Sequence, residues 1–162
     1  MKARRGDLSG PVLAILVTLI LLAIGAVIIA YFTLLAGPAP TPVLVVKDQP
    51  IAYKSGADAK VEVVVANIGT ANVTLKAGTD KTRLIITGPS GLVSDLGAAA
   101  TQTLGGDTAI APGSSKTLTF TFTGKWSDFA KYRSASARLV LIDTAGNTIA
   151  QFEVSIRIIG GG

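Results

Sequence analysis

The sequence predicts an α+β protein, in which a long hydrophobic N-terminal α-helix precedes an antiparallel β-sandwich. Three observations support this prediction. Residues 12–36 are almost entirely aliphatic, residues 37–42 are rich in proline, and the rest of the chain alternates polar and apolar residues as half-buried strands do. The 162 residues provide for the helix and for one further domain of about 120 residues.

The apolar segment is long enough to cross a membrane. Its 25 residues form a helix of roughly 37 Å, and the hydrocarbon core of a bilayer is about 30 Å thick. A helix that is hydrophobic on all faces must be buried in lipid or in protein. Two fates remain open, a permanent bilayer anchor or packing against copies of itself in a filament. In the filament, we expect the core to be formed by Leu13, Leu16, Leu21, Ile24 and Ile28.

Composition excludes several functions. Lys2, Arg4 and Arg5 supply three of the five net positive charges, and the other basic residues are scattered, so we expect no nucleic-acid partner. Residues 8–46 carry no charge. Cysteine and histidine are absent, which removes disulfides, thiolate sites, the usual general base and the commonest metal ligand. The ten acidic residues show no metal-binding spacing. We therefore expect no catalytic residues, no bound metal and no cofactor. We also expect that the protein is not an enzyme.

The basic N-terminus orients the helix. Positive residues beside a spanning helix tend to stay in the cytoplasm, so we expect the C-terminal domain outside. An ordinary secretory signal has an apolar region of only 7 to 15 residues, which is shorter than the segment seen here. A simple signal anchor is one interpretation of the basic flank and the long span.

The junction before the helix favours another interpretation. Arg4, Arg5 and Gly6 precede Asp7 and the apolar segment. This arrangement resembles the class III signal peptide of the archaeal type IV pilin and archaellin superfamily. The resemblance implies that a prepilin peptidase cleaves after Gly6 and leaves Asp7 first. Bacterial type IV pilins carry Glu at the fifth mature position, which is Pro11 here, so the pairing of that Glu with a neighbour's amino group does not carry over, and Asp7 is the alternative residue for a related role.

The resemblance implies a domain organisation and a function. Residues 1–6 are the leader, 7–37 a helix that spans the cytoplasmic membrane before assembly and forms the filament core afterwards, and 43–162 an extracellular β-sandwich. The chain is then the structural subunit of a homo-oligomeric helical filament at the cell surface, used for adhesion, with the prepilin peptidase as a further partner. The alternatives are an archaellin of a swimming filament and a single-span, membrane-anchored immunoglobulin-like binding module.

A proline-rich hinge separates helix and domain. Glycine ends the helix and alternate prolines prevent its continuation. Prolines at this spacing favour a stiff polyproline II spacer. The predicted hinge spans residues 38–42 and depends on Gly37, Pro38, Pro40 and Pro42.

The C-terminal domain shows strand patterns throughout. Alternation is clearest in residues 60–65, 116–123 and 151–158, and further strands are predicted at 43–46, 73–76, 83–87 and 137–142. Turn signals at 67–69, 88–91, 105–107, 111–113 and 145–147 separate them. This number of short strands predicts an immunoglobulin-like β-sandwich. Trp126 is expected either as an anchor in its core, which we favour, or as a subunit contact. One triplet, Asn72-Val73-Thr74, matches the N-glycosylation sequon.

Overall fold

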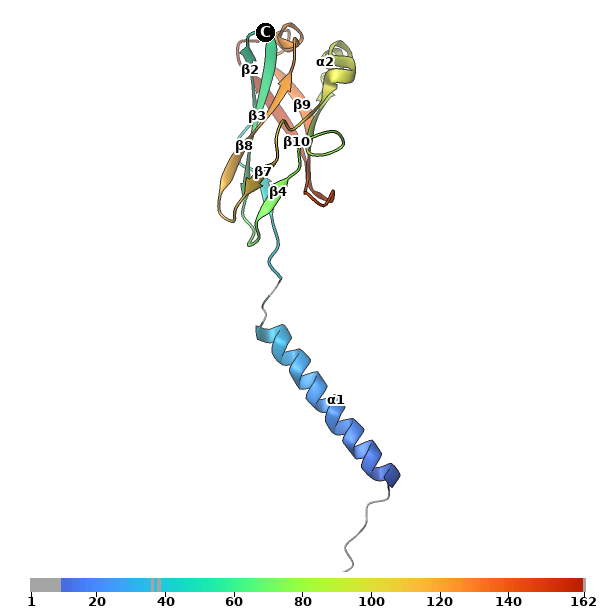
Figure 1. Ribbon diagram of the computed structural model, residues 1–162. Helices are drawn as coiled ribbons and strands as arrows, with labels where there is room; N and C mark the ends of the chain where they lie inside the picture. Colours follow the sequence, from blue (N-terminus) through green and yellow to red (C-terminus); the bar gives the residue numbers. More distant parts are fainter. Residues whose placement is uncertain (1–9, 36, 38, 162) are drawn as a thin grey trace, which may run out of the picture. The chain divides into compact units, whose positions relative to one another are not determined.

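The computed structural model describes residues 10–35, 37 and 39–161. It contains two compact units, Met1–Ala39 and Pro40–Gly162 (Figure 1). The first unit holds the apolar helix and the second a β-rich domain, so the predicted α+β class is confirmed at this level. The second unit includes part of the segment that the sequence predicts as the hinge.

The first unit contains helix α1, Gly10–Leu35, of 26 residues. Its length and composition suffice to cross a membrane. Gly37 has a φ of +63°, a left-handed conformation that glycine adopts without strain and that commonly follows a helix. The described helix lies within the predicted range 7–37. The predicted leader residues Arg4, Arg5, Gly6 and Asp7 and the hinge residue Pro38 lie outside the described residues.

The β domain contains ten strands and three short helical segments. The strands are β1 (Leu44–Val46), β2 (Ile51–Ser55), β3 (Asp58–Asn67), β4 (Val73–Leu75), β5 (Arg83–Gly88), β6 (Thr101–Thr103), β7 (Thr108–Ile110), β8 (Ser115–Phe122), β9 (Ser134–Ile142) and β10 (Thr148–Ile158). The helical segments are α2 (Ser90–Leu96), the 3-10 turn η1 (Gly97–Ala100) and α3 (Trp126–Phe129).

One mixed sheet of eight strands organises this domain. Its path runs β1-β3-β2-β10-β9-β5-β6, and β8 pairs with β3 on the other side. The neighbours are antiparallel except β2 and β10, which are parallel through Arg157 with Ile51 and Ile158 with Ala52. Strands β4 and β7 form a separate antiparallel pair.

The alternation of the sequence places one face of each main strand in a single core. Val61, Val63 and Val65 of β3 are completely buried, and so are the apolar residues of β8 that alternate with threonine. The same core includes Leu84 of β5 and Leu139 of β9. The β3–β8 and β5–β9 portions of the sheet thus contribute side chains to one apolar interior. The three clearest strand predictions are confirmed by β3, β8 and β10.

Trp126 at the start of α3 is half-buried and packs against the core. Its backbone N–H donates to the Ala57 carbonyl over 3.1 Å. The ring is therefore only partly in the interior, and its exposed part leaves a subunit contact open.

Candidate functional site

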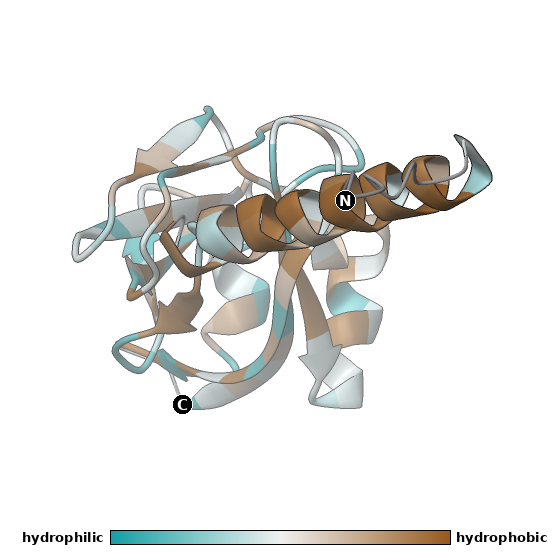
Figure 2. Cartoon of the chain, turned by 90° about the horizontal axis from the view of Figure 1, so that it is seen from below, coloured by the Kyte–Doolittle hydropathy of each residue, from teal (hydrophilic) through white to brown (hydrophobic). Residues whose placement is uncertain are grey.

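Helix α1 is the candidate assembly element, because none of its residues is buried. Figure 2 shows apolar colouring along the whole helix. The two threonine hydroxyls within it are satisfied locally, since Thr18 Oγ1 donates to the Ala14 carbonyl over 2.9 Å and Thr33 Oγ1 donates to the Ile29 carbonyl over 2.9 Å. Such bonds lower the cost of placing threonine in an apolar environment.

The five predicted filament-core residues are all exposed. Their exposed fractions are Leu13 49%, Leu16 49%, Leu21 63%, Ile24 51% and Ile28 49%. At 100° per residue, these five positions lie on one side of the helix. The opposite side is equally apolar, with Leu22 and Ile29 exposed by 65% and 68%. No face of α1 is therefore suited to water.

Gly25 interrupts the bulky surface of α1. A Cβ placed there would meet nothing within 4 Å. A shallow depression of about 440 Å³ surrounds it, lined by Thr18, Leu21, Leu22, Gly25, Ala26 and Ile29. Small residues allow helices to approach closely in apolar surroundings. The mostly apolar lining of this depression is chemically suited to an apolar side chain of a second helix.

The C-terminal part of the predicted hinge is bonded to the β domain. Thr70 N–H donates to the Thr41 carbonyl over 2.9 Å, and Thr41 N–H donates to Thr70 Oγ1 over 3.3 Å. Ile68 N–H donates to the Val43 carbonyl over 2.8 Å. Of the predicted hinge prolines, Pro40 is exposed and Pro42 is half-buried. Residues 41–43 thus belong structurally to the domain rather than to a free spacer.

Asn67, the last residue of β3, anchors this connection. Its side chain is completely buried. Its Oδ1 accepts from Val43 N–H at 3.4 Å and from Gly69 N–H at 3.0 Å, while Nδ2 donates to the Ala71 and Ile110 carbonyls at 2.7 and 3.1 Å. A buried amide with four partners fixes the segments that it joins, because each lost bond leaves an unsatisfied group.

Gly69 allows the close approach of these segments. A Cβ at this position would lie 2.3 Å from the Thr41 carbonyl oxygen and 2.4 Å from the Val43 nitrogen. Any larger residue must displace backbone. The sequence shows Asn67 and Gly69 only as a turn signal, so the buried role of the asparagine was not predicted.

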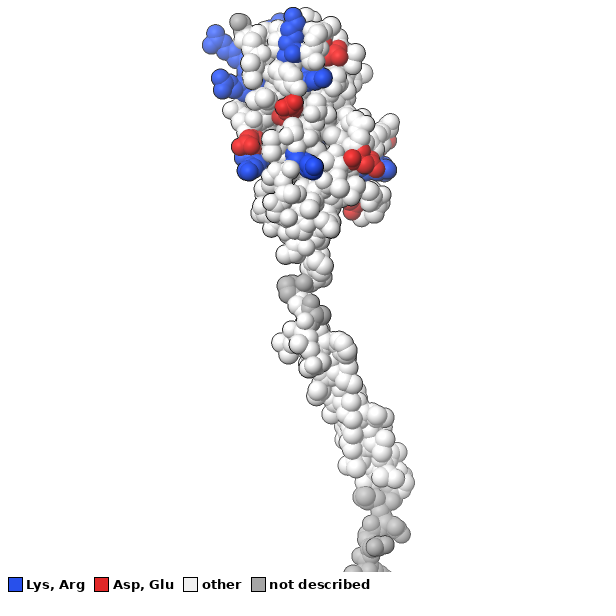
Figure 3. Space-filling view, turned by 60° about the vertical axis from the view of Figure 1, so that its left-hand side comes forward, with Lys and Arg blue, Asp and Glu red and all other residues white. Residues whose placement is uncertain are grey.

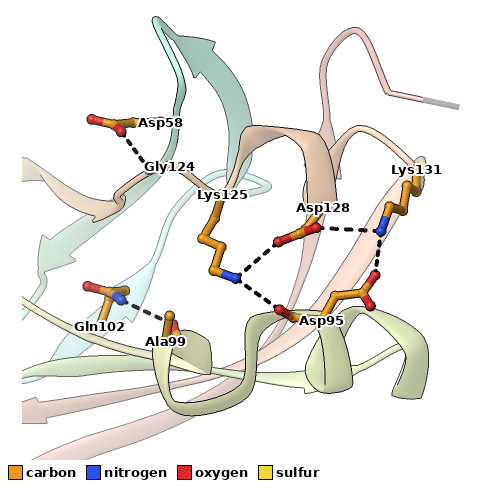
Figure 4. A network of polar contacts seen from close by, with 8 residues as sticks. All are labelled: Asp58, Asp95, Ala99, Gln102, Gly124, Lys125, Asp128 and Lys131. Atoms are coloured by element: carbon orange, nitrogen blue, oxygen red, sulfur yellow. Dashed lines mark hydrogen bonds and ion pairs between the residues drawn. The ribbon is translucent and has the colours of Figure 1, made fainter.

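A second polar cluster joins α2 to α3 (Figure 4). Lys125 Nζ donates to the Asp95 carbonyl over 3.0 Å and to Asp128 over 3.2 Å. Lys131 Nζ pairs with Asp95 at 2.7 Å, and the hydrogen bond from this ammonium to Asp95 raises the pKa of Lys131. Two cations face two carboxylates, so the cluster compensates its own charge and joins the two short helices.

Two further acidic residues, Asp107 and Asp143, stabilise turns. Asp107 accepts from Ala77 N–H over 2.8 Å and from Lys76 Nζ over 2.9 Å, and these bonds lower its pKa. Asp143 accepts from Asn147 N–H over 2.8 Å, which lowers its pKa as well. Among the described residues, no three Asp or Glu side chains gather as a possible metal site.

The sequon residue Asn72 is exposed and directly precedes β4. Thr74, the third residue of the triplet, lies half-buried within β4 and pairs with Ala109. The asparagine side chain is thus accessible to a modifying enzyme, and occupancy by a glycan remains a prediction.

Comparison with known proteins gives no family. No protein-family model matches the chain, and no curated protein matches it either. Solved structures that match part of the chain include the ApaA protein of Bordetella pertussis, with 16% identity, 74% of this chain and 98% of that chain covered and a TM-score of 0.36. A β-glucosidase of Listeria innocua has 16% identity, 76% and 16% coverage and a TM-score of 0.31. The match thus spans only a small part of the β-glucosidase.

Proposed function

We propose that this protein is the structural subunit of an extracellular filament of the archaeal type IV pilus kind. One observation carries the proposal: α1 exposes apolar side chains on every face and none of its residues is buried, whereas the β domain has a closed core of its own. Such a helix needs lipid or other helices around it.

The energetics favour a helix with neighbours. Seventeen large apolar side chains of α1 are exposed, and fully burying one Val, Leu, Ile or Phe is worth about 1.5–3 kcal/mol. A bilayer buries these side chains before assembly, and a bundle of identical helices buries them afterwards. The two threonines already bonded to their own backbone fit either environment.

The β domain is proposed to be an immunoglobulin-like sandwich that covers the filament. The strand pairing supports this proposal, because the strands fall into two groups. In the first group, β3 pairs with β1, β2 and β8, and in the second group the order is β10, β9, β5 and β6. The short parallel contact of β2 with β10 joins the two portions. In a filament, the outer face of this domain would meet the surface to which the cell adheres.

The mature N-terminus of native protein tests the proposal. Removal of the leader by a prepilin peptidase predicts Asp7 as the first residue, measured by mass spectrometry of sheared surface filaments. The matched variant Gly6→Val should retain Met1 and yield no filaments, because the peptidase needs a small residue before the cut. Native protein with Met1 intact, recovered only as detergent-soluble monomers, would support a membrane-anchored binding module and contradict the proposal.

A further inference from the structure

Strand β9 extends further than its neighbour β5. The last pair between the two strands joins Gly88 to Ser136, and after Gly88 the chain leaves the sheet through Pro89 and enters α2. Strand β9 begins earlier, at Ser134. Within the described part of the chain, no residue of β5 therefore pairs with Ser134. The open place beside it, which we call the β9 notch, is lined by Gly88, Pro89 and residues 132–136.

The peptide groups of Ser134 face the β9 notch. In an antiparallel sheet, the N–H and the carbonyl of one residue point to the same side, and successive residues alternate between the two sides. The Arg133 carbonyl accepts from Ile158 N–H over 2.9 Å, so the peptide groups of Arg133 face β10. Arg157, which lies opposite Ser134, donates its N–H to the Pro50 carbonyl on its other side over 2.8 Å. The N–H and carbonyl of Ser134 thus point away from β10 and into the notch.

The walls of the β9 notch belong to the folded domain. Tyr132 is half-buried and packs against the core, and Gly91 of α2 provides the space for its ring, because a Cβ at Gly91 would collide with the Tyr132 hydroxyl. Ala135 is buried. The notch has a volume of about 360 Å³, within the range of about 300–1,000 Å³ that is usual for ligand pockets. A preformed site of this kind lowers the entropic cost of binding.

The surroundings of the β9 notch are basic. The segments 82–94 and 129–142, which include its lining residues, contain no Asp or Glu. Arg133 in the notch and Arg157 opposite Ser134 are both exposed, and neither forms an ion pair with an acidic side chain of the described residues. Figure 3 shows Lys and Arg side chains gathered at the upper end of the domain, where α2 lies in Figure 1. The notch therefore favours a partner that carries negative charge.

We propose that the β9 notch binds an extended, acidic polypeptide segment, which takes the place that β5 leaves open beside Ser134. A peptide strand offers both the carbonyl and the N–H that the Ser134 N–H and carbonyl require. The Arg133 guanidinium can pair with two oxygens of an acidic side chain. A simple anion fits less well, because the Ser134 carbonyl on the same side repels it. The inference concerns the β domain and does not depend on the proposed filament.

Fluorescence anisotropy tests the inference with a defined probe. The probe is a short peptide of alternating valine and glutamate, blocked at both ends and labelled with an uncharged dye. Full-length protein in nonionic detergent micelles is titrated into it, with empty micelles as the blank. We expect this peptide to bind about tenfold more tightly than the same peptide with glutamine in place of glutamate, because hydrogen bonds to charged groups are the stronger ones. Equal binding of the two peptides, or no binding of either, would overturn the inference.

Competition separates a polypeptide from other acidic ligands. Sodium acetate and alginate are added at the carboxylate concentration of the peptide, and neither should displace it. Displacement by acetate would assign the notch to simple anions, and displacement by alginate would assign it to acidic polysaccharides. Either result would overturn the inference. Since the protein stays in micelles, these outcomes are independent of whether it polymerises.

Three variants assign the binding to the notch. Arg133→Gln should weaken binding of the glutamate peptide about tenfold and abolish its advantage over the glutamine peptide. Arg138→Gln removes the same charge from the same strand, at a side chain that pairs with Glu153, and should have little effect. Ser134→Pro removes the unpaired N–H at the first residue of a strand, where proline is tolerated, and should weaken both peptides alike.

Circular dichroism of the three variants should match that of wild type. Wild-type affinity in Arg133→Gln, or an equal loss in Arg138→Gln, would contradict recognition by Arg133. Wild-type affinity in Ser134→Pro would contradict the pairing of a strand with the edge of β9.

Discussion

Helix α1 and the β domain satisfy their apolar side chains in opposite ways. The domain encloses three phenylalanines within itself, since Phe120, Phe122 and Phe129 are completely buried. Phe122 and Phe129 also pack edge to face with ring centroids 5.0 Å apart. Helix α1 has no buried residue. The stability of the domain therefore depends on its own interior, and that of the helix depends on its surroundings.

Polar groups show the same difference. In α1, the hydroxyls of Thr18 and Thr33 bond only to carbonyls three or four residues earlier. In the domain, the buried Thr82 joins two distant segments, because its hydroxyl donates to the Ile142 carbonyl and accepts from the Ile142 N–H, each at 3.1 Å. The domain is specified by non-local polar contacts, while the threonine hydroxyls of α1 need no partner from outside the helix.

The largest effect is expected from charges in α1. Leu16→Asp, Leu21→Asp and Ile28→Asp should each abolish filaments, since a carboxylate at the centre of a spanning helix costs about 2.5–3.5 kcal/mol. The control Thr117→Asp changes an exposed residue of β8 and should leave filaments intact. Electron microscopy of sheared material and immunoblots of the membrane fraction measure the outcome. Normal filaments from all three α1 variants would refute the buried helical core.

The next effect concerns the domain interior. Phe120→Ala should lower the free energy of unfolding by about 3–5 kcal/mol, because it leaves a cavity at a fully buried site. Thr119→Ala, on the exposed face of the same strand, should change it by less than about 0.5 kcal/mol. Urea unfolding of residues 40–162, which we expect to be soluble and β-rich, measures both. A helical circular dichroism spectrum for this fragment would contradict the β fold.

A smaller effect is expected where the linker joins the domain. Gly69→Ala should destabilise the fragment by about 1–3 kcal/mol, since the added methyl group overlaps the Thr41 and Val43 backbone. Gly105→Ala is the control, because a Cβ there meets nothing within 4 Å. Equal unfolding midpoints for the two variants would show that the Thr41–Val43 segment does not pack closely against Gly69 in the folded fragment.

The smallest effect concerns acid stability. The pKa of Asp143 is lowered in the folded protein by the hydrogen bond from Asn147 N–H. Its stabilisation is therefore present above the unfolded pKa and is lost as the pH falls through the folded pKa. We expect the melting temperature of wild type to fall slightly more than that of Asp143→Asn between about pH 5 and pH 2. A steeper fall in the variant would reverse the assigned sign.

The sequence predicted those elements that follow from local patterns. The apolar segment predicted α1, and alternation with threonine predicted β8 because the burial of Leu118, Phe120 and Phe122 repeats every second residue. Segments too short to show a period were missed. Residues 88–91 were interpreted as a turn, yet α2 begins at Ser90, and only Leu92 and Leu96 mark its buried face.

The anchor of the linker could not be predicted from sequence. Asn67 resembles any turn asparagine, and its importance arises from partners up to 43 residues away. The pairing of β4 with β7 and the joining of α2 to α3 by Lys131 and Asp95 are non-local in the same way. A single sequence contains no signal for such contacts.

Cryo-electron microscopy of sheared native appendages tests the central claim most directly. The account predicts helical filaments whose central density is a bundle of α1 helices and whose outer density fits the β domain, with Leu16, Leu21 and Ile28 in helix–helix contacts. Native protein found only as single molecules in the membrane, or filaments with α1 absent from the centre, would contradict it.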